Sequence, residues 1–305
     1  MQVKLKATPE RIFVALTDSA ALKTWFAADA DVSVSEGRYD FWGKYTPDNP
    51  DREAGRHKLI AAIPNQSLRF AWRLRHDGTM LDTEVEYKLV ARGDDTLVTV
   101  QQREAVPVSD EPGHNFMEDV WFLHLENLRR YLAGKPSDVR IDFSESMLGD
   151  VTHTIDIDAP AEIVFDVLIK PEQLNRWIAS RATVDPRVGG EYDYGWGDFA
   201  RMKILELEPN KTLKLDSSDA EHSNGVLTWT LEESGGKTRL TMVHSGFAPD
   251  TDNSGIYKGW WNFLNWIRGL AEEGAGWQPP LLSLKPELQA YYAASIWAGQ
   301  AELIV

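Results

Sequence analysis

The sequence predicts an α+β protein built from two tandem copies of one domain, each a curved antiparallel sheet wrapped around a long C-terminal helix. The first observation is a repeat at a separation of 152 residues: Ala7–Phe13 returns as Ala159–Phe165, and Leu22–Ala27 returns as Leu174–Ala179. The second is that each copy runs from short helices through alternating strands to one long amphipathic helix. A separation this long exceeds the roughly 20–50 residues of a solenoid repeat and matches a whole domain.

The length of the chain fits this duplication. At 305 residues it can form two domains of ordinary size, each with its own core. A hydrophobic fraction of 43% with 12 Trp excludes a disordered chain. We expect a first domain at residues 1–137, a linker at 138–150, a second domain at 151–276 and a C-terminal tail with a helix at 277–305.

The first copy is predicted to open with a strand at Val3–Ala7 and two helices. The first helix begins at about Pro9, since proline suits the first turn of a helix, where its missing N–H costs nothing. The second, short helix ends near Trp25. The apolar side chains that predict these helices recur on one face at helical spacing; they are Ile12, Phe13, Leu16 and Leu22.

Four segments of the first copy then alternate apolar and polar side chains, which is typical of strands that bury one face. They are Tyr39–Phe41, Leu68–Arg75, Val85–Leu89 and Leu97–Val100. Arg92–Asp95 is typical of a hairpin turn. The closing helix is predicted at about Asn115–Leu132, because its apolar residues form one stripe. That stripe consists of Trp121, Leu125, Leu128 and Leu132.

The second copy follows the same plan. It begins with a predicted strand at Thr152–Ile157, a helix from Pro160 and a short helix ending at Trp177. The predicted strands are Glu191–Trp196, Lys203–Leu207, Leu213–Leu215, Val226–Leu231 and Arg239–His244. The closing helix is expected at about Ile256–Leu270, and a further helix in the tail from Pro286.

This order of elements, with these residues, resembles the START-like superfamily, also called helix-grip or SRPBCC, and looks most like its activator of heat-shock-protein-90 ATPase branch. The matching features are the opening at 159–165 with its weaker copy at 7–13, Trp25 and Trp177, the Gly-x-Tyr-Asp strands at 37–40 and 190–193, and the Pro-Asn-x-Ser/Thr-Leu turns at 64–68 and 209–213. The resemblance covers nearly all of 1–135 and 150–272. It implies two tandem helix-grip domains. It does not fix an activity, because lipid carriers, cyclases, receptors and co-chaperones share this fold.

A helix-grip domain is expected to leave a cavity between sheet and long helix. Aligning the last strands of the two copies places Gln102 opposite His244, on the same face as apolar neighbours. These two side chains are predicted to point toward the cavities, where one polar group can orient a ligand; the alternative is a solvated strand end. The pocket residues expected on this basis are Trp25, Phe41, Trp72, Gln102, Trp121 and His124 in the first copy, and Trp177, Tyr192, Tyr194, Trp196, Trp229, His244 and Trp260 in the second.

Trp266 is an outlier of the comparison between copies. It lies off the apolar stripe of its helix, and its counterpart in the first copy is Asn127. We therefore expect an exposed Trp266 that contacts something outside its domain. The apolar tail from Trp277 onward is a candidate, packing on Trp266, across the two domains, or on a second chain to give an oligomer.

Charge and motif content limit the partners. The net charge of −15 argues against nucleic acid or an anionic membrane. The second half, residues 138–305, holds 14 basic against 26 acidic residues, while residues 1–137 hold 18 against 21. This asymmetry indicates either a solvated acidic surface or a basic protein partner of the second domain.

No cofactor or metal is expected. The chain contains no Cys, its seven His are scattered, and no zinc-protease or nucleophile-elbow motif occurs. The segment 195–200 has the spacing of a dinucleotide fingerprint, but strands follow it where a helix is required. No apolar stretch approaches the ~20 residues of a membrane span, and the N-terminus has no signal-peptide core. We expect a cytoplasmic protein.

The leading expectation for function is non-enzymatic binding of a small hydrophobic or amphipathic ligand between sheet and helix. Two alternatives remain open. One is a co-chaperone or protein-interaction module of the type that the resemblance implies. The other is a cyclase- or hydrolase-like enzyme with His244 or His124 as general base. The differences between the copies favour a specialised second domain and a plainer first one.

Overall fold

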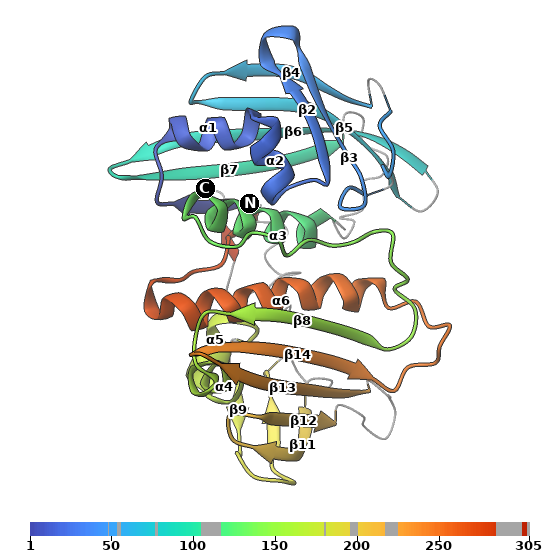
Figure 1. Cartoon of the computed structure of the whole chain (residues 1–305), viewed down its shortest axis with the longest axis vertical. Coiled ribbons are helices and arrows are strands. Elements are labelled where there is room, and N and C mark those ends of the chain that lie inside the picture. The colour runs from blue at the N-terminus through green and yellow to red at the C-terminus, as the bar shows by residue number, and fades with distance from the viewer. Residues whose placement is uncertain are drawn as a thin grey trace. The chain divides into compact units, whose positions relative to one another are not determined.

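The structure is a computed structural model that describes residues 1–47, 49–53, 56–76, 79–104, 117–179, 181–195, 201–216, 225–284 and 301–303. It separates into two compact units (Figure 1). Unit 1 comprises Met1–Ser146 together with Pro280–Ser283, and unit 2 is built around Met147–Pro279. Each unit combines an antiparallel sheet with a long helix near its end, so the predicted α+β fold class with tandem helix-grip domains is confirmed.

Unit 1 contains a five-stranded sheet in the order β1-β7-β6-β5-β4 and a separate pair, β2-β3. Its elements are β1 (Gln2–Leu5), α1 (Pro9–Thr17), α2 (Ser19–Trp25), β2 (Asp29–Ser33), β3 (Arg38–Trp42), β4 (His57–Ile63), β5 (Ser67–His76), β6 (Thr79–Arg92), β7 (Asp95–Glu104) and α3 (Met117–Leu132). The four residues of the predicted stripe of α3 are all buried.

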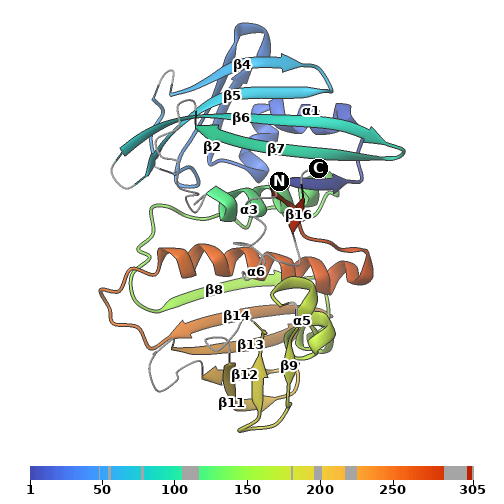
Figure 2. The ribbon, with the colours of Figure 1, turned by 180° about the vertical axis from the view of Figure 1, so that it is seen from behind.

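Unit 2 contains a seven-stranded sheet in the order β8-β14-β13-β12-β11-β10-β9. Its elements are β8 (Val151–Ile157), α4 (Ala161–Ile169), α5 (Pro171–Trp177), β9 (Thr183–Val184), β10 (Glu191–Asp193), β11 (Arg201–Glu208), β12 (Thr212–Asp216), β13 (Val226–Ser234), β14 (Lys237–Ser245) and α6 (Ser254–Glu273). The helix α6 runs alongside β8 in both ribbon views (Figure 2). In the tail, β15 (Leu282–Leu284) pairs with β16 (Ala301–Leu303).

Three long-range hydrogen bonds recur at equivalent positions of the two units. Each joins a side chain to a backbone carbonyl oxygen of the opening segment. In unit 1 the bonds are Trp25 Nε1 to Ala15 O (3.1 Å), Tyr39 Oη to Leu16 O (2.9 Å) and Thr96 Oγ1 to Ala7 O (2.7 Å). In unit 2 they are Trp177 Nε1 to Val167 O (3.0 Å), Tyr192 Oη to Leu168 O (2.7 Å) and Thr238 Oγ1 to Ala159 O (2.7 Å). All six side chains are buried. The sequence repeat is therefore a repeat of the same buried contacts.

The turn between β4 and β5 is repeated between β11 and β12. Asn65 and Asn210 both have φ of 63°, and they are the non-glycine residues with positive φ in the described part of the chain. Asparagine tolerates this left-handed conformation better than most side chains. The repeated Pro-Asn motif thus specifies the same turn twice.

Two strands of unit 1, β2 and β4, were not predicted. The ladder between β4 and β5 shifts register between Leu59 and Ala61, and the equivalent ladder in unit 2 shifts between Ile204 and Glu206. Such a bulge adds one residue and reverses the side-chain alternation beyond it. β11 was nevertheless predicted, as Lys203–Leu207, so the bulge alone does not account for the missed β4.

The segment that follows each long helix folds back onto that helix. In unit 2 this segment buries Trp266, which was expected to be exposed. Its side chain is fully buried, with its ring 6.4 Å from that of Trp277 and 5.8 Å from that of Phe263. Arg176 holds the same segment through a 2.6 Å hydrogen bond from Nη2 to Trp277 O. The expected exposure of Trp266 was wrong, whereas the start of the tail, which was named as one candidate partner, does pack on this ring through Trp277. The predicted helix from Pro286 lies outside the described residues.

The equivalent side chain in unit 1 has the same structural task. Asn127 Nδ2 donates to the carbonyl oxygen of Val139, in the segment that follows α3, at 2.6 Å. Arg140 of this segment donates to Ala27 O at 2.8 Å. Residues 138–146 belong to unit 1, although the sequence placed them in a linker. Asn127 and Trp266 therefore differ in chemistry, but each contacts the segment that follows its own long helix.

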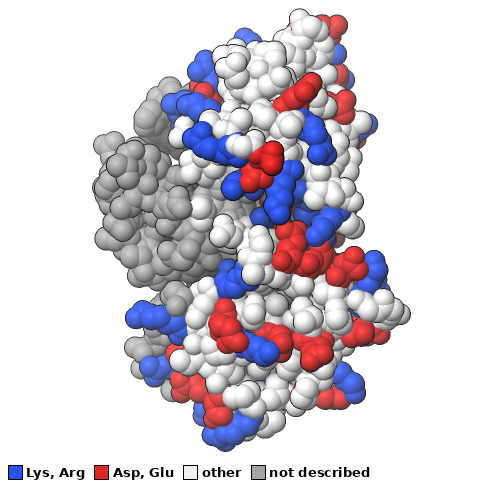
Figure 3. All heavy atoms as spheres, turned by 90° about the vertical axis from the view of Figure 1, so that its left-hand side faces the viewer, with Lys and Arg blue, Asp and Glu red and all other residues white. Residues whose placement is uncertain are grey.

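The charges of the described surface are mixed. On the face shown in Figure 3, basic and acidic side chains are interspersed over both units. Within the described residues, no helix is both long enough and apolar enough to span a membrane.

Candidate functional site

The interior of unit 1 is a cluster of aromatic rings centred on Phe26. Its ring centroid lies 4.4 Å from that of His124, 5.0 Å from Phe41, 5.3 Å from Trp25, 5.9 Å from Trp72 and 6.5 Å from Trp121. Five of the six residues predicted to line the first pocket thus meet around one residue that was not predicted. Phe26 follows Trp25 in the repeated segment, and its counterpart Ile178 is equally buried, which is the signal that could have found it.

The sixth predicted residue, Gln102, joins the same cluster from the last strand. Its Oε1 accepts a 2.7 Å hydrogen bond from Trp121 Nε1 of α3. Its Nε2 donates to Thr83 Oγ1 at 2.9 Å. Gln102 is partly buried and directed at the helix, so the alternative of a solvated strand end does not apply.

His124 is almost completely buried on α3. Burial is the main reason that its pKa falls to about 3, with the charge of Arg140 as the smaller cause. The ring is therefore neutral at pH 7. Its Nδ1 is buried and has no hydrogen-bond partner among the described residues.

The indole of Trp72 occupies the sheet side of the cluster. It contacts Trp121 at 5.7 Å and Phe41 at 5.1 Å, both with perpendicular rings. Its side chain is 1% exposed, and none of the described residues accepts a hydrogen bond from its Nε1. By contrast, the indole N–H of Trp25 is satisfied by the backbone of α1, which gives Trp25 a structural task.

Unit 2 has a comparable but less dense cluster. Trp229 contacts Trp260 at 5.4 Å and Trp177 at 6.5 Å, in both cases with perpendicular rings. Trp229 is fully buried, and its Nε1 has no hydrogen-bond partner in the portion of unit 2 that the structure describes. Trp177 is tied to α4 through its own N–H, as Trp25 is to α1.

His244 takes the place of Gln102 in unit 2. Its Nδ1 accepts a 3.1 Å hydrogen bond from Trp260 Nε1, and its ring lies 4.9 Å from that of Phe247. An Nδ1 that accepts leaves the proton of the neutral ring on Nε2. Gln102 and His244, which the alignment of the two copies made equivalent, thus each accept a hydrogen bond from an indole N–H of the long helix.

Two of the residues predicted for the second pocket, Tyr192 and Tyr194, contact each other. The rings of Tyr192 and Tyr194 are 5.4 Å apart, and both side chains are buried. Burial raises the pKa of both hydroxyls well above the usual value. Tyr192 is fixed by its hydrogen bond to Leu168 O, a structural contact. Trp196 lies outside the described residues.

The sequence reasoning missed a buried polar group in unit 1. The separation of equivalent residues falls from 153 for Phe41 and Tyr194 to 145 for His57 and Met202, so the first copy is eight residues longer here. This insertion supplies Asn49, whose Nδ2 lies 3.1 Å from Nε2 of His57. The side chains of Asn49 and His57 are 2% and 3% exposed. The difference in length was the available signal.

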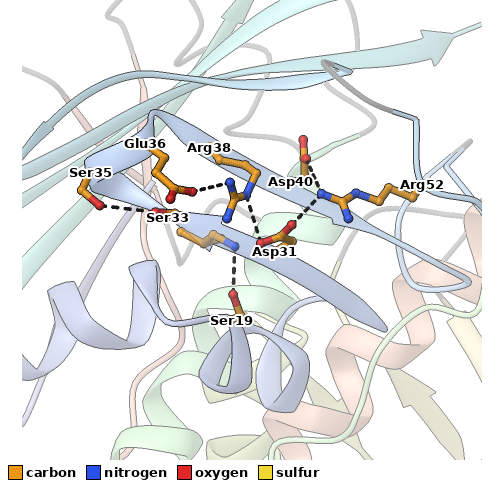
Figure 4. A network of polar contacts seen from close by, with 9 residues as sticks. Ser19, Asp31, Ser33, Ser35, Glu36, Arg38, Asp40 and Arg52 are labelled. Carbon is orange, nitrogen blue, oxygen red and sulfur yellow. Dashed lines mark hydrogen bonds and ion pairs between the residues drawn. The ribbon is translucent and has the colours of Figure 1, made fainter.

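Salt bridges hold the inserted segment against β2 and β3 (Figure 4). Arg52 donates to Asp31 at 2.6 Å and to Asp40 at 3.3 Å, and its guanidinium lies over the ring of Trp42. Arg38 donates to the other oxygen of Asp31 at 3.0 Å. This network positions the segment that carries Asn49.

A metal centre is not indicated by the part of the chain that the structure describes. There, no group of three or more His, Asp or Glu side chains is arranged to hold an ion.

Comparison with known proteins gives a family. The sequence profile described as "Activator of Hsp90 ATPase homolog 1-like protein" matches residues 6–133 and 158–272. A search of curated proteins found no match.

Solved structures of low identity are similar to one or both units. The Aha1 dimer of Colwellia psychrerythraea has 22% identity and a TM-score of 0.39, covering 42% of this chain and 98% of that one. CalU16 of Micromonospora echinospora has 22% identity and a TM-score of 0.36, over 50% and 87% of the two chains. DynU16, from the dynemicin biosynthetic locus, has 16% identity and a TM-score of 0.32, over 90% and 97%.

The family assignment rests on the profile, which covers both repeats and includes the residues that make the duplicated contacts. The chain therefore belongs to the Activator of Hsp90 ATPase homolog 1-like family, and it carries two tandem copies of the family's domain.

Proposed function

We propose that the protein is a non-enzymatic binding module whose two domains each hold a small hydrophobic or amphipathic molecule between sheet and long helix. The aromatic clusters around Phe26 in unit 1 and Trp229 in unit 2 supply the apolar contacts. The pairs Gln102–Trp121 and His244–Trp260 fix the long helix beside the last strand.

The observation that carries the proposal is an unsatisfied indole N–H in each cluster. Trp72 Nε1 in unit 1 and Trp229 Nε1 in unit 2 are buried, and neither has an acceptor within the described part of the chain. Leaving a buried donor unpaired costs about 1–3 kcal/mol. A ligand with one acceptor atom would recover this free energy in either domain, while its apolar body packs on the surrounding rings.

A ligand panel read by tryptophan fluorescence and calorimetry tests the proposal. Fatty acids, flavonoids and polyketide-like aromatics are titrated into the full chain. Trp72→Phe and Trp229→Phe keep most of the apolar ring and remove the N–H, so each should weaken binding in its own domain about 3- to 10-fold.

Trp42→Phe is the control, because Trp42 lies under Arg52 and outside the cluster. It should leave affinity unchanged. A panel without any saturable response, or equal losses in all three variants, would argue against the proposal.

The second candidate is a co-chaperone role, and family membership is the observation that favours it. In that case the protein should stimulate the ATPase activity of a purified chaperone of the heat-shock-protein-90 class. The excess of acidic residues in the second half suits a basic surface on such a partner. Absence of both stimulation and complex formation would rule this candidate out.

We do not favour an enzyme that uses His124 as general base. A base works best when its pKa lies near the operating pH. The pKa of His124 is about 3 because the ring is buried, so the ring is a poor proton acceptor at neutral pH.

A further inference from the structure

The insertion of unit 1 creates a polar corner in an otherwise aromatic interior. We call the side chains of Asn49, His57 and Trp72 the polar corner. His57 stacks on Phe41 with ring centroids 4.0 Å apart, and its centroid lies 6.1 Å from that of Trp72. Phe41 and Trp72 both contact Phe26, so the polar corner adjoins the aromatic cluster around Phe26.

The backbone decides how the amide of Asn49 is oriented. Its Nδ2 donates to the carbonyl oxygen of Phe41 at 2.8 Å, and a carbonyl oxygen can only accept. The second hydrogen on Nδ2 is then available to Nε2 of His57 at 3.1 Å. His57 Nε2 must therefore accept, so the proton of the neutral imidazole lies on Nδ1.

This assignment leaves three buried polar atoms without a partner among the residues that the structure describes. They are two donors, His57 Nδ1–H and Trp72 Nε1–H, and one acceptor, Asn49 Oδ1. None of the three side chains is more than 3% exposed. Buried polar atoms are nearly always paired in folded proteins, so such a set indicates a partner with both donor and acceptor atoms.

The second domain has no equivalent of this arrangement at the His57 position. Met202 of β11 occupies that position when the register shifts at Leu59/Ala61 and Ile204/Glu206 are aligned, although β11 also pairs with β10 whereas β4 ends its sheet. Methionine offers neither a donor nor a strong acceptor. The two domains therefore present different chemistry to a bound molecule.

We infer that the first domain selects apolar ligands whose uncharged polar end both accepts and donates hydrogen bonds, such as a carboxamide or a hydroxy-carbonyl group, through Asn49, His57 and Trp72. This inference rests on the proposed function and adds the class of ligand. A carboxylate end is disfavoured because the three groups of the polar corner are uncharged, and the positive charge that acts on His57, that of Arg56, is already paired with Glu53. A hydrocarbon end is disfavoured because it leaves all three atoms unpaired.

Three probes of one shape separate these cases: 2-naphthamide, 2-naphthoate and 2-methylnaphthalene. Each is titrated calorimetrically into the full chain. We expect 2-naphthamide to bind the first domain at least 10-fold more tightly than 2-methylnaphthalene or 2-naphthoate. His57→Met introduces the residue that the second domain has at this position. It should bring the affinities for 2-naphthamide and 2-methylnaphthalene to within about 3-fold of each other, with little change in the affinity for 2-methylnaphthalene.

Trp229→Phe is the matched control in the second domain and should leave the amide preference of the first intact. Trp72→Phe, which retains a ring, provides a second variant if His57→Met does not fold, and it should reduce the preference about 3- to 10-fold. Equal affinity of the wild-type protein for amide and hydrocarbon would overturn the inference and leave the proposed function standing, since solvent would then satisfy the three atoms. A preference that survives both variants would also overturn it. No binding of any probe would instead contradict the proposed function.

Discussion

The indole N–H of Trp121 donates a 2.7 Å hydrogen bond to the side-chain oxygen of Gln102, and this bond links the long helix α3 to the last strand of its sheet. In unit 2 the indole N–H of Trp260 makes the equivalent bond to Nδ1 of His244, at 3.1 Å. Both domains thus have a hydrogen bond from a Trp of the long helix to the last strand, but the acceptor is Gln102 in one and His244 in the other. Gln102 additionally donates to Thr83, which fixes the orientation of its amide.

Removing the acceptor should destabilise the first domain. Gln102→Leu leaves the indole N–H of Trp121 without its acceptor in an interior site, while the hydroxyl of Thr83 keeps its hydrogen bond to Trp72 O. We expect a loss of about 1–3 kcal/mol in the free energy of unfolding, measured with urea. Gln101→Leu is the matched control, because Gln101 is exposed on the opposite face of the same strand and should change stability by less than about 0.5 kcal/mol. Equal effects of the two variants would refute a stabilising role for the Gln102–Trp121 bond.

Gly269 is required for the docking of Trp277 on α6. A methyl group at Gly269 would lie 2.6 Å from Cδ1 of the Trp277 ring, which is far inside normal contact. Gly269→Ala should therefore displace Trp277 and expose its indole. The expected readout is a red shift of tryptophan fluorescence and faster proteolysis after residue 276.

The same helix offers a control for this substitution. A Cβ at Gly259 would meet nothing within 4 Å. Gly259→Ala should stabilise the protein by about 0.5–1 kcal/mol, because alanine is the better helix former. If Gly269→Ala behaves in the same way, the ring of Trp277 is not held against this face.

Phe26 should be the side chain whose truncation most weakens the first domain. Phe26→Ala leaves a hole among five aromatic rings and should cost about 3–5 kcal/mol. Benzene should restore part of this loss, since apolar cavities of this size bind it. Phe26→Ile introduces the residue of the second domain and should cost less than half as much, without rescue by benzene. Equal melting temperatures for Phe26→Ala with and without benzene would contradict this expectation.

Three buried histidines should make the fold sensitive to acid. Burial lowers the pKa of His57 and His124 to about 3 and that of His153 to about 4. In the unfolded chain each titrates near 6.5, so between these values the unfolded state binds more protons. Stability is then complete above pH 6.5 and falls with decreasing pH, by about 1.4 kcal/mol per pH unit for each histidine. Urea unfolding at pH 7, 6 and 5 measures this slope.

His153→Phe separates one histidine from the others. The variant loses the hydrogen bond from Nε2 to Tyr257 O and should be about 1 kcal/mol less stable at pH 7. Its stability should then fall less steeply than that of the wild-type protein between pH 6.5 and 4. Parallel slopes for the two proteins would show that His153 is not neutral in the folded state.

The candidate site was predictable where the repeat carried the information. Period two placed Gln102 and His244 on the inner face of their strands, and the alignment of copies made them equivalent. Their partners were not predictable, because the hydrogen bonds from Trp121 and Trp260 depend on how each helix is rotated above its sheet. The helical stripe specifies a face but does not specify which indole atom meets which strand residue.

The polar pair of Asn49 and His57 shows a different limit. We expected the first domain to be the plainer one, yet the insertion places both side chains in its interior. Asn49 lies in a loop without periodicity, and His57 begins a strand whose alternation is broken by a bulge. Neither local pattern indicates burial.

The sequence by itself determined the duplication, the order of elements and the buried faces, because these follow from repeated motifs and from periodicities of two and 3.6 residues. Only the tertiary structure decided that Trp266 is covered by Trp277, that Phe26 is the centre of the first core, and that Asn49 meets His57. The physical reason is that periodicity describes which way a side chain points along its own element. Whether that side chain is buried, and against what, depends on segments that arrive from elsewhere in the chain.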